Sequence, residues 1–227
     1  MANRLKRKLV LAAVAALVIC VAVPSFAAQV LVYTQNPDFN GLIASQNDTG
    51  GGFGNFATAY DNFTLGSTTA LTQVQWTGGY FNPQSQGPIS AWTVSFYANN
   101  AGQPGSLISS FGISGNAGES ALGSDNIGDP VFLYTAAVNF SAAGGTTYWL
   151  SVVPDIAYPP QWGWTTSTQG DGVSYQDFFG TRSAKANDLS FSLYYTQQTG
   201  VPEPGSLMLL GTGVVGLAGI LRRKLGA

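Results

Sequence analysis

The sequence contains no histidine, and its single cysteine, Cys20, lies in an apolar segment close to the N-terminus. Ser-His-Asp and Cys-His catalysis need these residue types, as do the common zinc sites. These chemistries are therefore excluded for the region that begins at residue 28. The same region cannot form a disulfide, so its stability must come from a packed core.

Basic residues are also scarce in the middle of the chain. Of the nine lysines and arginines, only Arg182 and Lys185 lie between residues 28 and 200, where ten of the eleven acidic residues occur. With two positive and ten negative charges this region has a net charge of about −8, whereas the whole chain has −2. Nucleic-acid binding draws its affinity from lysine and arginine contacts with phosphates. A nucleic-acid partner is therefore excluded.

The N-terminus combines basic residues with an apolar run. Four cations lie between Arg4 and Lys8, the run extends from Leu9 to Val23, and Pro24–Ala27 supplies a helix breaker and small residues. This order is typical of a secretory signal peptide. We expect a signal helix at residues 1–27, which the Sec translocon accepts and signal peptidase removes.

Residues 201–227 have three parts. They open with a proline-rich motif, Val201, Pro202, Glu203 and Pro204, and continue as an uncharged run from Gly205 to Leu221. As a helix this run of 17 residues would span about 25 Å, the lower limit for crossing a hydrocarbon core. Three cations end the run and would stay on the cytoplasmic side: Arg222, Arg223 and Lys224. The order predicts a C-terminal transmembrane helix, with the preceding domain outside the cytoplasm.

This three-part tail resembles the PEP-CTERM sorting signal of exosortase substrates, which are surface and exopolysaccharide-associated proteins of Gram-negative bacteria. The resemblance implies that the tail holds the chain transiently in the inner membrane until an exosortase-type membrane protease cleaves near Pro202–Pro204. It also implies a final location at the cell surface or in the extracellular matrix of a biofilm. An ordinary membrane anchor is the alternative, but it would not need a Pro-Glu-Pro motif.

Between the two termini the hydrophobic pattern has a period of two. Residues 71–76, 92–96 and 189–195 alternate, and runs rich in aromatic and β-branched residues occur at 131–140, 146–153 and 162–166. Breaks rich in glycine, asparagine, proline and serine separate them: 48–54, 78–88, 99–105, 114–130 and 168–172. We expect one all-β domain at residues 28–200, an antiparallel, jelly-roll-like β-sandwich of about eight to ten strands. Gly102–Gly105 fits a type II turn.

Three segments support this fold in another way. These segments resemble extracellular β-sandwich domains that often precede such sorting tails: Tyr60–Leu65 with Trp76–Tyr80, Phe96–Gly105, and Gly145–Ser151. This looser resemblance implies a fold and no activity.

Aromatic residues suggest a carbohydrate site. Trp162 and Trp164 are two apart, so both indoles lie on one face of an extended strand. Exposed aromatic rings can stack on sugars, whereas buried ones would fill the sandwich core. Further aromatic residues are candidates for bordering a groove at the loop ends: Tyr80, Phe81, Tyr175, Phe178 and Phe179.

The carboxylates are the remaining candidates for chemistry. A glycosidase needs two of them about 5 to 9 Å apart, and Glu119 is the only glutamate between residues 28 and 200. Calcium prefers clustered oxygen ligands, which turn-like segments offer at Asp125, Asp129, Asp171 and Asp177. Solvated aspartates that bond their own turns are the alternative interpretation.

Three functions fit these observations. The first is a non-enzymatic structural or adhesive module of the cell surface or exopolysaccharide matrix, with no catalytic residue and no cofactor except a structural calcium ion. The second is a carbohydrate-binding module that uses Trp162 and Trp164. The third is a glycoside-active enzyme that uses Glu119 and an aspartate.

Overall fold

The computed structural model describes residues 28–197 and 204–225. The predicted signal peptide at residues 1–27 lies outside the described residues, and so do Val201, Pro202 and Glu203 of the proline-rich motif. The described residues fall into two units, Gln29–Thr196 and the C-terminal segment with residues 204–225, and each is described by itself.

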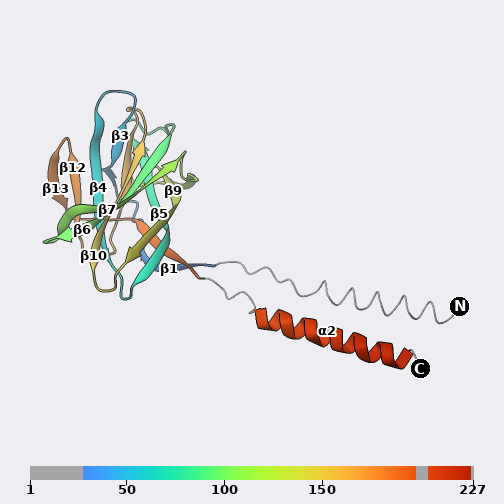
Figure 1. Ribbon diagram of the computed structural model, residues 1–227. Coiled ribbons are helices and arrows are strands. Elements are labelled where there is room, and N and C mark those ends of the chain that lie inside the picture. The colour runs from blue at the N-terminus through green and yellow to red at the C-terminus, as the bar shows by residue number, and fades with distance from the viewer. Residues whose placement is uncertain (1–27, 198–203, 226–227) are drawn as a thin grey trace. The chain divides into compact units, whose positions relative to one another are not determined.

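The first unit consists of two β-sheets (Figure 1). The eight-stranded sheet contains β1 (Ala28–Gln35), β2 (Leu42–Ala44), β5 (Thr69–Phe81), β8 (Ser120–Ser124), β9 (Pro130–Ala142), β11 (Gln161–Ser167), β14 (Asp188–Leu189) and β15 (Phe191–Gln197). The seven-stranded sheet contains β3 (Gln46–Asp48), β4 (Gly54–Thr64), β6 (Ala91–Asn100), β7 (Gln103–Ser114), β10 (Thr147–Asp155), β12 (Ser174–Phe178) and β13 (Thr181–Lys185). The prediction of an all-β sandwich is confirmed.

The strand pairing is almost entirely antiparallel. The long strands β4, β5 and β6 alternate between the two sheets, and so do β9, β10 and β11. The chain therefore crosses repeatedly from one sheet of the sandwich to the other. The jelly-roll topology itself stays a prediction. The fifteen strands of the described region exceed the eight to ten expected, because several are short or carry no hydrophobic alternation.

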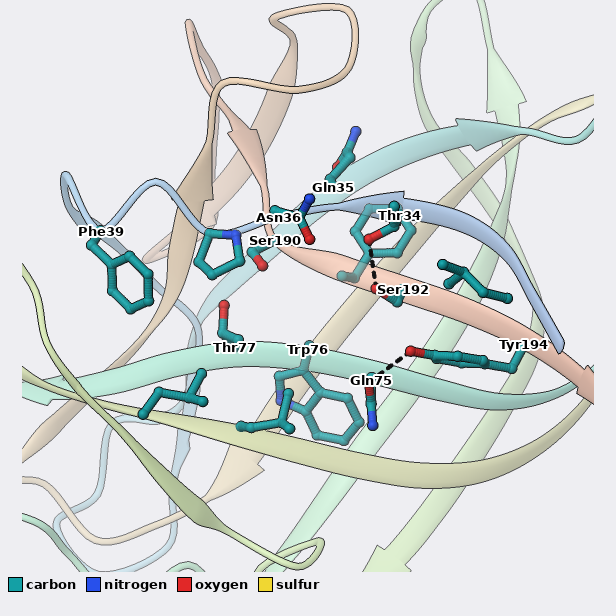
Figure 2. A pocket seen from close by; sticks show the side chains of 15 residues that line it. Thr34, Gln35, Asn36, Phe39, Gln75, Trp76, Thr77, Ser190, Ser192 and Tyr194 are labelled. Carbon is teal, nitrogen blue, oxygen red and sulfur yellow. Dashed lines mark hydrogen bonds between the residues drawn. The ribbon is translucent and has the colours of Figure 1, made fainter. Parts of the chain in front are cut away.

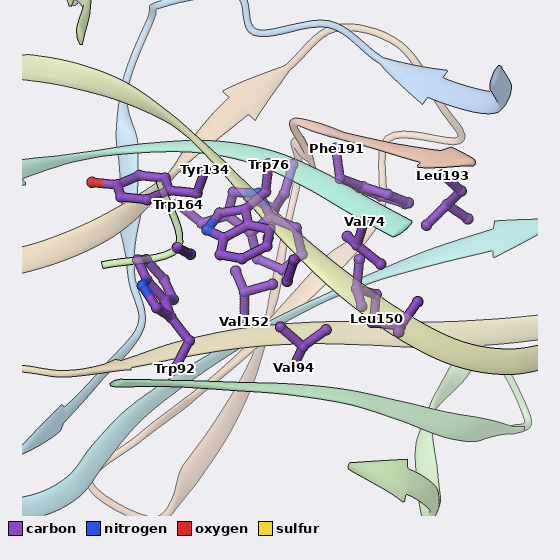
Figure 3. Close-up of a cluster of buried hydrophobic side chains, with 14 of the residues drawn as sticks. Val74, Trp76, Trp92, Val94, Tyr134, Leu150, Val152, Trp164, Phe191 and Leu193 are labelled. Carbon is purple, nitrogen blue, oxygen red and sulfur yellow. The ribbon is translucent and has the colours of Figure 1, made fainter. Parts of the chain in front are cut away.

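Aromatic and aliphatic side chains from both sheets form the core (Figure 3). Trp76 of β5 meets Trp92 of β6 with ring centroids 4.9 Å apart, and Phe96 stacks on Phe140 at 4.1 Å. These residues are buried because alternate positions of each strand point to the same side. Burying one such side chain contributes about 1.5–3 kcal/mol, so the core supplies the stability that disulfides cannot.

The break expected at residues 78–88 begins later than predicted, because β5 continues to Phe81. Gly78 and Gly79 are strand residues that allow close packing. A Cβ atom at Gly78 would overlap the Trp162 ring, and one at Gly79 would overlap the carbonyl oxygen of Pro130. Here glycine marks a close approach of neighbouring strands and not a turn.

The type II turn expected at Gly102–Gly105 is wrong, because β7 already begins at Gln103. The turn lies at Ala101 and Gly102, whose φ angles are 51° and 81°. Two successive residues with positive φ are typical of the two-residue turn that matches the twist of a β-hairpin.

The C-terminal unit contains the helix α2 (Pro204–Leu225), with Arg222, Arg223 and Lys224 in its last turn. Among the residues that the structure describes, no helix combines the length and the apolar character needed to cross a membrane. The transmembrane role of this segment stays a prediction.

Candidate functional site

Trp162 and Trp164 lie in the core, so the prediction that they stack on a carbohydrate is wrong. Both side chains are fully buried. The Trp162 ring lies 4.9 Å from that of Trp92, and the Trp164 Nε1 donates a hydrogen bond to the carbonyl oxygen of Ser190 at 2.7 Å. The two indoles do share one face of β11, but that face points to the other sheet.

A groove with a volume of about 520 Å³ lies on the outer face of the eight-stranded sheet (Figure 2). We call it the polar groove. Its accessible surface is mostly apolar, but several hydroxyl and amide side chains line it: Thr34, Asn36, Gln75, Thr77, Ser192 and Tyr194. Leu31, Phe39 and Leu122 are among its apolar residues.

The alternation of β5 and β15 explains why polar side chains gather in the polar groove. Val74 and Trp76 point into the core, so Gln75 points outward. Ser192 pairs with Gln75 across the two strands, and its neighbours Phe191 and Leu193 are also core residues. The outward face of this part of the sheet is therefore polar.

Hydrogen bonds hold the side chains of the polar groove in place. Thr34 Oγ1 and Ser192 Oγ are 2.8 Å apart, and the Tyr194 hydroxyl donates to Gln75 Oε1 at 2.9 Å. These contacts join β1, β15 and β5. The groove is thus pre-organised on three strands of the sheet.

Thr77 contributes an unpaired hydroxyl. The residue is 4% exposed, and its Oγ1 has no hydrogen-bond partner within the described part of the chain. Figure 2 shows this oxygen pointing into the polar groove near Ser190. A buried polar group without a partner costs about 1–3 kcal/mol, which a ligand that reaches the hydroxyl would offset.

Phe39 adopts a strained backbone at one end of the polar groove, opposite Tyr194 (Figure 2). Its φ angle is 55°, which is uncommon for a bulky residue and costs about 1–3 kcal/mol. The carbonyl oxygen of Phe39 accepts a hydrogen bond from the amide of Asn126 at 2.9 Å. The surrounding loops therefore hold this ring where local preference alone would not place it.

A second depression of about 320 Å³ involves Phe81 and Phe178. Of the five aromatic residues predicted to border a groove, Phe81 and Phe178 both line this depression. Tyr80 is fully buried, and Tyr175 packs on Trp149.

Next to this depression is a cluster that we call the aromatic patch: Phe53, Phe56, Tyr158, Phe178 and Phe179. Three of its rings are 40–59% exposed, with Phe179 the most exposed. Phe179 has a φ angle of 47° and precedes Gly180 in the turn between β12 and β13. Asparagine or glycine suits this turn position better, so local stability does not account for an exposed phenylalanine there.

The four aspartates proposed as calcium ligands do not form one cluster in the described part of the chain. Asp177 forms an ion pair with Arg182 at 2.7 Å, and Asp171 accepts a hydrogen bond from the Asn62 amide at 2.9 Å. The structure therefore does not combine Asp171 and Asp177 into a shared site with Asp125 and Asp129. No cluster of three or more His, Cys, Asp or Glu residues suited to a metal occurs in the described ranges.

Asp125 and Asp129 do lie together, as buried side chains of a loop whose residues 126–128 are exposed. Asp125 Oδ1 accepts hydrogen bonds from the amides of Ile127 and Asp129 at 3.0 and 2.8 Å, while its Oδ2 is buried without a partner. Burial raises the pKa of Asp129, and the Asp125 carboxylate raises it further. This loop offers oxygen atoms that a cation would stabilise.

Glu119 belongs to a polar network beside the core. Its Oε2 accepts hydrogen bonds from the hydroxyls of Tyr80 and Tyr134 at 2.5 and 2.8 Å, and Oε1 accepts one from the Gln86 amide. The Tyr134 hydroxyl in turn accepts a hydrogen bond from Trp162 Nε1. Neither depression described above has Glu119 or another carboxylate in its lining.

Asp61 is a buried carboxylate that was not predicted from the sequence. Its Oδ2 accepts a hydrogen bond from the amide of Leu189 at 2.5 Å, and its Oδ1 accepts one from Asn62 at 2.7 Å. Burial raises its pKa, and the nearby carboxylates of Asp188 and Asp171 raise it further. Its alternation with Ala59 and Phe63 places all three on one face of β4, but the sequence does not show that this face is the buried one.

Comparison with known proteins identifies the tail. The family model of the PEP-CTERM protein-sorting motif matches residues 200–224. No curated protein matches the chain. The sorting signal predicted from the proline-rich motif, the apolar run and the terminal cations is confirmed, and it implies export and processing by an exosortase in the membrane.

Proposed function

We propose that residues 28–200 form a non-enzymatic adhesive module of the cell surface or extracellular matrix, which the sorting signal delivers. The observation that carries this proposal is the order of the two parts: the sandwich ends at Gln197, and the sorting motif begins at residue 200. The domain is therefore the part that remains after a cut near the motif.

The surface of the sandwich supports an adhesive role. The polar groove and the aromatic patch both present side chains that the core does not use. The two strained phenylalanines, Phe39 and Phe179, lie one at each surface. Strained residues cluster at functional sites, so both surfaces are candidates for contact with a partner.

Cell fractionation and mass spectrometry test the export step. We expect the mature protein to lack residues 1–27 and the part of the tail beyond the motif, and to occur outside the inner membrane. A variant with Pro202, Glu203 and Pro204 all changed to alanine should keep its tail and accumulate in the membrane fraction. Lys185→Ala, which changes a surface charge far from the motif in sequence, serves as the control and should be processed normally.

The proposal is wrong if the intact chain is recovered soluble in the cytoplasm. It is also wrong if the triple-alanine variant is processed and released like the unmodified protein.

A further inference from the structure

The polar groove has the size of a ligand site. Its volume of about 520 Å³ falls within the roughly 300–1,000 Å³ that ligand pockets occupy. It lies across β1, β15 and β5, whose side chains are fixed by hydrogen bonds between strands. An elongated ligand could therefore contact several strands at once.

The charge of the domain and of the polar groove restricts the ligand. None of the residues that line the groove carries a formal charge, although the region from 28 to 200 has ten acidic and two basic residues. An anionic polymer would be repelled by this net charge, and a cation would find no carboxylate in the lining. The ligand that fits is uncharged.

The polar atoms of the groove suit hydroxyl groups. Hydroxyls donate and accept hydrogen bonds, and amides offer a donor and an acceptor side by side. Thr34, Ser192 and Tyr194 provide the first kind of group, and Gln75 provides the second. The unpaired Thr77 hydroxyl would gain a partner from a ligand hydroxyl.

Apolar surface completes the match. Phe39 and Tyr194 lie at opposite ends of the polar groove (Figure 2), and Leu31 and Leu122 add apolar surface to its lining. Sugar rings combine hydroxyl edges with apolar C–H faces that pack on aromatic rings. We propose that the polar groove binds a neutral oligosaccharide, an inference that rests on the adhesive function proposed above.

Calorimetric titration of the mature protein recovered from cells tests this inference. The probes are hexasaccharides of neutral α-glucan, β-glucan, β-mannan and β-xylan, with an oligoguluronate of equal length as the anionic comparison. We expect at least one neutral hexasaccharide to bind with a Kd of about 10 µM to 1 mM. The oligoguluronate should not bind, and no new reducing ends should appear during the titration.

Three variants locate the binding site. Phe39→Ala and Gln75→Ala should each weaken binding about tenfold or more, because they remove a ring and an amide from the polar groove. Phe179→Ala is the matched control: it also removes an exposed phenylalanine with a positive φ angle, but from the aromatic patch, and it should leave the Kd unchanged. Circular dichroism and thermal unfolding check that each variant is folded.

The inference is overturned if no neutral hexasaccharide binds the folded protein at about 5 mM. It is also overturned if Phe39→Ala and Gln75→Ala bind as tightly as the unmodified protein, or if Phe179→Ala loses as much affinity as they do. A protein that is exported and processed but fails these tests would contradict the inference alone. A failure of export would contradict the adhesive function whatever the glycan affinity.

Discussion

Arg182 Nη1 donates a hydrogen bond of 2.8 Å to the carbonyl oxygen of Pro104. Arg182 lies on β13 and Pro104 on β7, and these strands are the two opposite edges of the seven-stranded sheet. The Arg182 side chain therefore bridges the two edges of the sheet. Arg182 also forms two hydrogen bonds with Asp177 and lies over the Tyr60 ring, 5.2 Å from its centroid.

This contact explains the burial of residues that face away from the core. Trp149 is 1% exposed although its neighbours Tyr148 and Leu150 pack toward the core. Its ring packs on Tyr175, and Tyr60 packs on Tyr97. The curled sheet thus encloses a second aromatic cluster on its outer side.

Loss of the Arg182 side chain should weaken this contact between β13 and β7, which we call the closure of the sheet. We expect Arg182→Ala to lower the free energy of unfolding by about 1–2 kcal/mol, because a charge-assisted pair and a hydrogen bond to a carbonyl are lost together. Lys185→Ala on the same strand should change it by about 0.5 kcal/mol or less. Urea unfolding measures both values, and equal effects of the two variants would contradict the proposed closure.

The same closure should weaken in acid. Hydrogen bonds from Arg182 lower the pKa of Asp177. A carboxyl whose pKa is lowered in the folded state stabilises the fold above its unfolded pKa of about 3.9, and this stabilisation is lost as the pH falls through the folded pKa. The stability difference between the unmodified protein and Arg182→Ala should therefore shrink from pH 7 to pH 3. A difference that stays constant over this range would exclude the ion pair as its source.

Much of the fold could be predicted because period-two alternation is a local property of the sequence. All six predicted runs lie wholly or largely within strands, from β5 to β15. β8 was not predicted, because its five residues are all exposed and carry no hydrophobic alternation. Gly78 misled the prediction because its close contact with Trp162 comes from a strand more than eighty residues away.

The burial of Trp162 leads to a stability prediction. Trp162→Ala removes a fully buried indole from the core and leaves the Tyr134 hydroxyl without a donor. We expect a loss of about 3–5 kcal/mol, measured by urea unfolding. Trp162→Phe keeps a ring and should cost less. A stability equal to that of the unmodified protein for Trp162→Ala would contradict its place in the core.

The candidate site was harder to predict than the fold. Gln75 and Ser192 are 117 positions apart, and they meet only because β5 pairs with β15. Asp61 lies in an ordinary polar context of the sequence, and its burial depends on which face of β4 meets the other sheet. Which strands pair, and which face of a strand meets the other sheet, depend on the whole domain. Alternation within one strand therefore does not determine them.

The loop of Asp125 and Asp129 allows a test of the calcium prediction. A calcium ion bound there would pair with the unpartnered Oδ2 of Asp125 and relieve the repulsion between the two carboxylates. Calcium at about 100 times its Kd should then stabilise the fold by about 2.7 kcal/mol, seen as a higher melting temperature. Asp125→Asn should remove the shift, whereas Asp171→Asn should keep it. No shift in excess calcium would exclude a tight site.

Asp61 should make the domain less stable as the pH rises. Its pKa is raised by burial and by Asp188 and Asp171. A carboxyl with a raised folded pKa contributes stability that is complete below its unfolded pKa of about 3.9, and that is lost as the pH rises through the folded pKa. Asp61→Asn cannot ionise, so its stability relative to the unmodified protein should increase from pH 4 to pH 8. The substitution also weakens the hydrogen bond from the Leu189 amide. That cost does not change with pH, so it shifts the whole curve and leaves its slope unchanged.

Asp177→Asn is the control for this slope because the pKa of Asp177 is lowered instead of raised. Its stability relative to the unmodified protein should decrease over the lower part of the same pH range, opposite in sign to Asp61→Asn. Urea unfolding at steps of pH measures both curves. A flat curve for Asp61→Asn would show that the pKa of Asp61 is unshifted, as in an exposed carboxyl, and would contradict its burial.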